Sequence, residues 1–218
     1  MKPNSVVKHP EPVVEFVRRA RERLLPAAPM LPDISVKAAG DHELAPDLAD
    51  VVKNSSLPAA VLVPVVAREE PTVLLTQRSA ELPVHAGQIS FPGGKLDPAD
   101  PDPLATALRE ADEEIGLDAG FVDPLGYLEP YLSGTGFRIV PVVALVSPAF
   151  HLVLNPAEVD EAFEVPLKFL MTPDNHAQHS REWKGVQRSF YAMPYGERYI
   201  WGITAGILRK LYERLYGQ

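Results

Sequence analysis

The sequence contains no cysteine among its 218 residues. This absence excludes disulfide bonds and thiolate-held metal centres, and it is typical of a reducing compartment, so we expect a cytoplasmic protein. The chain also lacks an apolar run of the roughly 18 residues that a membrane-spanning helix needs. Its N-terminus lacks the apolar region of a signal peptide. We therefore expect no membrane partner.

Positive charge is scarce. The chain has 21 Lys and Arg residues against 29 Asp and Glu residues, a net charge of −8. This balance speaks against non-specific binding to nucleic acid, which is driven by basic side chains. An acidic protein that acts on a phosphate-rich substrate needs a metal ion and local arginines to offset the repulsion. The apolar share of 46% supports a sizeable core.

Two regions differ in composition. Residues 1–56 read as an N-terminal extension, in which apolar side chains recur at helical spacing from Val13 to Leu25 and Pro26 ends the helix. Residues 26–56 are rich in Pro, Ala and Asp, with a short helix expected near Leu48–Lys53. Residues 57–218 are predicted to form one domain.

Strands and helices alternate along this domain. The first two strands are predicted to form a hairpin, and Pro64 in the first indicates a bulge or an edge position. A helix follows a Gly-Gly turn, and another closes the chain after Ile203. Strands are predicted at 59–68, 72–78, 88–91, 122–129, 137–146, 151–154, 158–167 and 187–192, with a short helix at 166–171. The order suggests a mixed sheet between helices, an α/β fold.

The stretch from Phe91 to Leu117 organises the chain. It opens with a Pro-Gly-Gly turn, crosses a loop rich in Asp and Pro, and enters a helix with an apolar stripe. Glu110, Glu113 and Glu114 share a wedge about 100° wide opposite that stripe. Like charges at this spacing repel by a few tenths of a kcal/mol per pair, a cost that a bound divalent cation reverses. A solvated charged face is the simpler interpretation of such a run.

The Gly-Gly turn upstream favours the metal site, because the whole stretch resembles the Nudix box, a glycine followed by REUxEExGU with U a bulky apolar residue. The second half is matched by READEEIGL, from Arg109 to Leu117. Ala111 is small for its position, and the spacing from Gly94 to Arg109 is one residue longer than the common pattern, so Asp100 is the best match to the acid of the first half. The resemblance implies the α/β/α sandwich of Nudix domains, with an N-terminal helical extension.

The resemblance also implies a metal-dependent enzyme. Glu110 and Glu114, one turn apart, would be the main ligands of Mg²⁺ or Mn²⁺, and Glu113 would assist directly or through water. Arg109 would hold a glutamate in place rather than touch substrate.

Three further positions are expected to support this chemistry. Gly93 and Gly94 allow backbone to approach the metal or the phosphate closely. Many Nudix enzymes draw one more acid from outside the box as a ligand or general base. Glu158 and Glu161 are the candidates here. We expect Glu158, because it opens a probable strand beside a loop, where such a residue would be exposed, although either could instead be a surface acid.

The segment before the box, LLTQRSAELPVHAGQISFPGG, resembles the signature of the coenzyme A pyrophosphatase branch of this family, roughly LLTxRS, then HxGQ, then FPGG. Arg78 can make a two-pronged contact with phosphate, and His85 and Gln88 can donate to phosphate or ribose oxygens. Pro83 departs from the branch, which commonly has a basic residue there. This departure leaves the exact substrate open.

The C-terminal part, from Arg188 to Gly206, also looks like that branch. Thr204 is expected to cap the last helix. Trp201 and Tyr199 are expected in the core rather than as adenine-stacking groups.

The expected reaction is hydrolysis of the pyrophosphate of coenzyme A or its acyl derivatives, giving 3′,5′-ADP and 4′-phosphopantetheine, acylated or not. One alternative is another nucleoside diphosphate derivative, such as ADP-ribose or NADH. Another is a nucleotide-sensing Nudix module without turnover, against which the intact READEE speaks. The first 56 residues could cover a sheet edge or form a homodimer contact.

Overall fold

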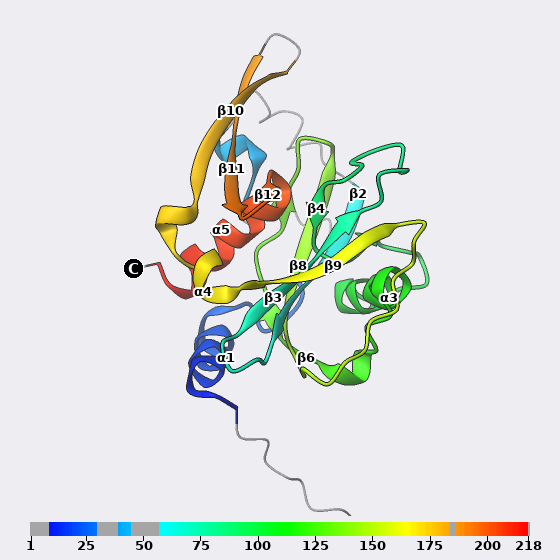
Figure 1. Ribbon diagram of the computed structural model, residues 1–218, viewed down its shortest axis with the longest axis vertical. Helices are drawn as coiled ribbons and strands as arrows, with labels where there is room; N and C mark the ends of the chain where they lie inside the picture. Colours follow the sequence, from blue (N-terminus) through cyan, green and yellow to red (C-terminus); the bar gives the residue numbers. More distant parts are fainter. Residues whose placement is uncertain (1–8, 30–38, 45–56, 184–185, 218) are drawn as a thin grey trace, which may run out of the picture.

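The computed structural model describes residues 9–29, 39–44, 57–183 and 186–217. Nine strands form one mixed sheet, with the path β1-β7-β8-β2-β3-β4 and with β5, β6 and β9 paired to β2, β8 and β3 (Figure 1). The strands are β1 Ala39–Gly40, β2 Leu57–Val66, β3 Thr72–Arg78, β4 Ile89–Ser90, β5 Gly93–Lys95, β6 Val122–Tyr127, β7 Tyr131–Leu132, β8 Phe137–Val146 and β9 Val159–Pro166.

The sheet is organised around β2 and β8, which run parallel along ten residue pairs, from Leu57 opposite Phe137 to Val66 opposite Val146. Apart from Arg138, both strands are runs of apolar residues, because both of their faces are buried over most of their length. Side chains alternate between two cores: Val63 packs on one side of the sheet and Leu62 on the other.

Helices cover both faces of this sheet. α3 (Pro103–Ile115) packs on one face, and α1 (Glu11–Arg23), α4 (Leu167–Leu170) and α5 (Ile203–Leu215) pack on the other (Figure 1). Single turns of 3-10 helix, η1 Asp41–Glu43, η3 Ala119–Phe121 and η4 Pro173–Asn175, join the elements. The predicted mixed sheet between helices is confirmed.

Pro64 shows how the interior of the sheet tolerates a proline. The Leu62 N–H donates to the Pro92 carbonyl at 2.9 Å, so Pro64, two residues on, faces the same side of β2. On that side β2 changes partner, from β5 at residues 59–61 to β3 at residues 65–66. The prediction of an edge position is wrong, because β2 has neighbours on both sides. The predicted β2–β3 hairpin pairing is confirmed.

The predicted strand at 151–154 is wrong. Leu152 and Leu154 do pack against the core under α3, which explains the apolar pattern. The backbone of this segment, however, pairs with the end of a helix and not with a strand: the Val153 N–H donates to the Ile115 carbonyl at 2.9 Å. The segment is therefore an extended loop that satisfies the end of helix α3.

A second, three-stranded antiparallel sheet packs on α5. It consists of β10 (Ala177–Trp183), β11 (Val186–Tyr195) and β12 (Arg198–Trp201), and the sequence predicted only the middle of β11. The prediction that Tyr199 belongs to the core is wrong, because its side chain is 40% exposed. Thr204 does not cap α5: its hydroxyl donates to the Ile89 carbonyl at 2.9 Å and ties the start of the helix to β4.

The described part of the N-terminal region packs into the larger core. Val13, Phe16 and Ala20 on α1 are at most 1% exposed. The helix ends at Arg23, just before the predicted end, and Leu25 then pairs with Tyr127. The short helix predicted near 48–53 lies outside the described residues. Among the described residues, the helices are all too short or too polar to cross a bilayer.

Candidate active site

Capping residues at both ends of helix α3 fix where the helix begins and ends. The Asp102 side chain accepts a hydrogen bond from the Ala105 N–H at 2.9 Å, and Pro103 takes the first helical position. Gly116 ends the helix in the left-handed conformation, with φ of 66°. Ala107 and Ala111 are fully buried against the sheet. The glutamates on the neighbouring face of the helix therefore have fixed positions.

Glu114 is the most buried acidic side chain of the site, at 2% exposed. It accepts a hydrogen bond from the Gly93 N–H at 3.2 Å, and Arg78 Nη1 lies 3.8 Å from its Oε1. Burial raises the pKa of Glu114 to about 8, and the negative charges of Glu110 and Glu158 add to the rise, while the Gly93 N–H and Arg78 oppose it. A second positive charge beside Glu114 would lower this pKa.

Close packing leaves no room for a side chain at Gly93, where a Cβ would clash with the backbone carbonyl of Ala60. A Cβ on Gly94 would lie 2.5 Å from the carboxylate of Glu110, which would have to move. Backbone of the turn therefore lies directly against the Glu110 carboxylate. Burial also raises the pKa of Glu110.

Arg109 connects the acids that surround the helix, as the sequence predicts. It pairs with Glu110 and Glu113 at 2.9 Å each and with Asp100 at 3.0 Å. This guanidinium lowers the pKa of Asp100 to about 2. Glu113 differs from the other two box glutamates, because its side chain is 54% exposed and turned to Arg109. The structure thus places Glu113 at the rim of the cluster.

Glu158 reaches this cluster through the loop that follows Val153. The Asn155 N–H donates to the Glu114 carbonyl at 2.9 Å, and the Asn155 side-chain amide donates to the Glu158 carboxylate at 3.0 Å. The Ser79 N–H donates a hydrogen bond to the Glu158 carbonyl at 2.8 Å. Asn155 is not predicted from the sequence, because its position depends on how the loop crosses the end of α3. Its one sequence signal is the turn-forming Asn-Pro pair.

The other candidate acid, Glu161, is engaged elsewhere. Both of its carboxylate oxygens accept hydrogen bonds from Arg198, at 2.7 and 2.8 Å, and this pair lowers the pKa of Glu161. The Arg198 guanidinium also lies 3.6 Å from the ring centroid of Phe163. The structure thus brings Glu158, and not Glu161, to the box glutamates.

Arg78 stands at the end of β3, a quarter exposed. Its Nε is buried, and within the described part of the chain this atom has no hydrogen-bond partner. Buried donors are nearly always paired, so an unpaired guanidinium N–H marks a place where an acceptor is to be supplied. A phosphate oxygen is such an acceptor.

The loop from Ser79 to Gln88 folds back onto Arg78. The Arg78 N–H donates to the Gln88 carbonyl at 2.9 Å, and the Gly87 N–H donates to the Arg78 carbonyl at 3.1 Å. His85 and Gln88 pair with each other at 2.9 Å, and the His85 backbone is left-handed, with φ of 59°. Both predicted ligand-binding side chains thus lie on a loop joined to Arg78 through its backbone.

The donor set fits a divalent cation. The negative charge of Glu158 contributes to the raised pKa of both Glu110 and Glu114, so the three carboxylates lie near one another, and hard cations take such oxygen ligands. Within the ranges that the structure describes, no group of three or more acidic or histidine side chains is placed to hold a metal ion by itself. Mg²⁺ does not require one, since it keeps several waters and binds through few carboxylates.

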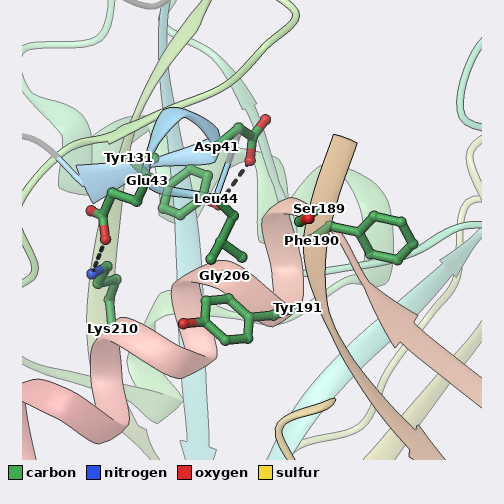
Figure 2. A pocket seen from close by; sticks show the side chains of 11 residues that line it. Asp41, Glu43, Leu44, Tyr131, Ser189, Phe190, Tyr191, Gly206 and Lys210 are labelled. Carbon is green, nitrogen blue, oxygen red and sulfur yellow. Dashed lines mark hydrogen bonds and ion pairs between the residues drawn. The ribbon is translucent and has the colours of Figure 1, made fainter. Parts of the chain in front are cut away.

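A smaller polar cluster lies away from these acids (Figure 2). Asp41 accepts hydrogen bonds from the Tyr131 hydroxyl and the Gly134 N–H, both at 2.8 Å. Lys210 pairs with Glu43 at 2.6 Å. The cavity beside them measures about 20 Å³, room for a single water. These contacts anchor residues 39–44 to β7 and α5 and leave no space for a substrate.

The chain is similar to proteins of one family. The family model described as "NUDIX domain" matches residues 56–185. A protein called "Uncharacterized Nudix hydrolase NudL" from Photorhabdus laumondii is 43% identical over 157 residues, 72% of this chain and 84% of that protein. Its namesake from Yersinia enterocolitica is also 43% identical, over 72% of this chain and 80% of that protein. A solved structure of a MutT/nudix family protein from Enterococcus faecalis superposes with a TM-score of 0.45 at 15% identity, over 74% of each chain.

Proposed function

The chain belongs to the Nudix family of hydrolases, which act on pyrophosphate bonds, and from this premise we propose that it cleaves coenzyme A or its acyl derivatives with the help of Mg²⁺ or Mn²⁺. The products would be 3′,5′-ADP and 4′-phosphopantetheine, acylated or not. The choice of substrate rests on the resemblance of residues 74–94 to the coenzyme A pyrophosphatase branch. We also propose that residues 57–218 are the catalytic domain, that residues 1–56 are an N-terminal extension, and that the protein works in the cytoplasm.

One observation carries the proposal. Carboxylates that need a cation, Glu110, Glu114 and Glu158, lie beside an arginine whose buried Nε needs an anion, Arg78. A metal–pyrophosphate complex supplies both charges at once. A phosphate alone would face the repulsion of the glutamates, and a cation alone would leave the Arg78 donor unpaired.

Each residue then has a role that follows from its place. When bound, the divalent cation neutralises the pyrophosphate and lowers the pKa of water. Glu110 and Glu114 hold it, and Glu158 takes the proton of the attacking water, with Asn155 fixing its carboxylate. Arg78 donates to the phosphoryl oxygens on which negative charge grows.

The turn and the preceding loop complete the site. Gly93 and Gly94 keep backbone close to the carboxylates, which narrows the space that the phosphate occupies. His85 and Gln88 donate to ribose or phosphate oxygens from the loop next to Arg78. Glu113 acts on the cluster through Arg109 or through water.

The test is a product assay with Mg²⁺ or Mn²⁺ and a panel of coenzyme A, acetyl-coenzyme A, ADP-ribose and NADH. We expect 3′,5′-ADP from the first two and none of it with Glu114→Gln. Glu158→Gln is expected to lower kcat by about 100-fold, the usual size of a general-base contribution. Glu161→Gln, three residues away and outside the cluster, is the matched control and should change kcat less than threefold.

The alternatives give different results. Faster cleavage of ADP-ribose or NADH would keep the site and overturn the substrate. Binding of metal and nucleotide without turnover of any compound on the panel would identify a sensing module instead.

A further inference from the structure

The small sheet has two different faces. Met193 on β11 and Ile200 on β12 are fully buried toward α5. Since side chains alternate along a strand, the neighbours of these residues lie on the opposite face. That face carries four aromatic rings, which we call the aromatic face: His179, Phe190, Tyr199 and Trp201.

The four rings form two cross-strand pairs. His179 Nδ1 lies 2.6 Å from the Tyr199 hydroxyl, and the two rings are stacked with centroids 5.9 Å apart. Phe190 and Trp201 meet edge to face at 5.3 Å. These contacts fix the ring orientations before any ligand arrives. An open groove runs along the face and is lined by the same rings together with Ser180 and Arg181.

The small sheet is joined to the strands that border the candidate active site. Arg198 extends from the face of β12 opposite to Tyr199, because side chains alternate along a strand, and it forms the two hydrogen bonds with Glu161 on β9. Strand β12 also contacts β4, the strand that leads into the Gly-Gly turn (Figure 1). The strand that carries Tyr199 and Trp201 is therefore the one that borders the site.

We propose that the aromatic face binds the purine ring of the nucleotide substrate by stacking, with Arg181 pairing with a phosphate of the same nucleoside. This inference rests on the proposed function and names the subsite for the base. Nucleobases stack on exposed tyrosine, tryptophan and histidine rings, and an arginine beside them supplies the charge that a nucleotide needs.

The size of the groove favours a small ligand. Its volume is about 580 Å³, within the roughly 300–1,000 Å³ of small-ligand sites. A few aromatic groups with one or two polar ones are the usual lining of a small-molecule site. The occupant is thus a nucleotide base rather than a protein partner.

The experiment measures binding without turnover. AMP, adenosine and ribose 5-phosphate are titrated into the full chain by calorimetry. Tyr199→Leu is expected to weaken AMP by about 5- to 100-fold, the range for one stacked base, and to leave ribose 5-phosphate unchanged. Tyr199→Phe keeps the ring and should restore AMP affinity to within threefold. Glu182→Gln, exposed on the other face of β10, is the matched control and should bind AMP like the unmodified protein.

Arg181→Gln provides a test that does not touch the rings. It should weaken AMP about two- to fivefold and leave adenosine unchanged, as for an exposed charge pair. Unchanged AMP affinity in both Tyr199→Leu and Arg181→Gln would overturn the inference, as would the absence of AMP binding by the unmodified protein. A Tyr199→Leu variant that alters the oligomeric mass but not AMP affinity would mark the face as an interface between copies.

The experiments distinguish a failure of the proposed function from a failure of the base subsite. If no pyrophosphate is cleaved but AMP affinity depends on Tyr199, the proposed function is wrong and the base subsite stands. If coenzyme A is cleaved with the same KM by Tyr199→Leu, the proposed function stands and the base subsite is wrong.

Discussion

In metal-free protein, replacing Glu114 with glutamine is predicted to stabilise the fold at neutral and alkaline pH. The pKa of Glu114 is raised from 4.5 to about 8 in the fold, chiefly by burial. A carboxyl whose folded pKa is raised contributes fully to stability below pH 4.5, and this contribution is lost as the pH rises toward 8. Glutamine keeps the shape and stays neutral, so Glu114→Gln avoids this loss.

The size of the effect follows from the pKa change. The interval from 4.5 to about 8 corresponds to about 5 kcal/mol in the free energy of unfolding above pH 8, at 1.36 kcal/mol per pH unit. At pH 7 the loss has reached about 3 kcal/mol. For a chain of this length that is roughly 6–12 °C in Tm. Below pH 4.5 the difference should vanish.

The assay is thermal unfolding of both proteins in chelator from pH 4.5 to 8.5, repeated with millimolar Mg²⁺. We expect Mg²⁺ to stabilise the unmodified protein and to leave Glu114→Gln unchanged. Glu113→Gln, at a half-exposed position on the same helix, is the matched control, with a change of about 0.5 kcal/mol or less. Equal stability of the unmodified protein and Glu114→Gln across this pH range would refute the reasoning.

Three further substitutions test other parts of the account. Gly94→Ala places a Cβ 2.5 Å from the Glu110 carboxylate and should weaken Mn²⁺ binding by about tenfold or more in a calorimetric titration, with unchanged circular dichroism; unchanged Mn²⁺ affinity would contradict the close packing. Arg78→Lys loses the two-pronged phosphate contact and should lower kcat/KM by about 10- to 100-fold, and a change under threefold would remove Arg78 from the site. Phe16→Ala should cost about 3–5 kcal/mol in urea unfolding because Phe16 is 1% exposed, whereas a cost below 1 kcal/mol would mean that α1 is not part of the core.

Most of the central sheet could be predicted from the sequence, because most of its strands coincide with runs of apolar residues. The limits of β8, residues 137–146, follow from a stretch that is apolar at every position except Arg138. β10 was missed because its residues, AQHSREW, are mostly polar and lie on an outer hairpin, where pairing leaves little apolar pattern. At 151–154 a strand was predicted where the structure has a loop. The apolar pattern there reflects burial under α3, and a buried segment does not need a strand partner.

The candidate site likewise has one part that the sequence predicts and another part that it does not. Glu110, Glu114 and the two glycines belong to one short motif, so local spacing predicts their proximity. The partners of the two outer acids depend on long-range contacts: Glu158 is set by Asn155, whose backbone bonds Glu114, and Glu161 is withdrawn by Arg198, 37 residues away. No local pattern contains those contacts, so the sequence favoured Glu158 only by its place at the start of a strand and kept Glu161 as the other candidate.

The claim on which the whole account depends is that Glu110 and Glu114 hold the catalytic cation. Anomalous diffraction from crystals grown with Mn²⁺ and 3′,5′-ADP locates that ion directly. The expected result is a Mn²⁺ peak beside the carboxylates of Glu110 and Glu114, with Arg78 in contact with the phosphate, and no peak there in Glu114→Gln. A peak elsewhere, with these glutamates still bound only to protein groups, would contradict it.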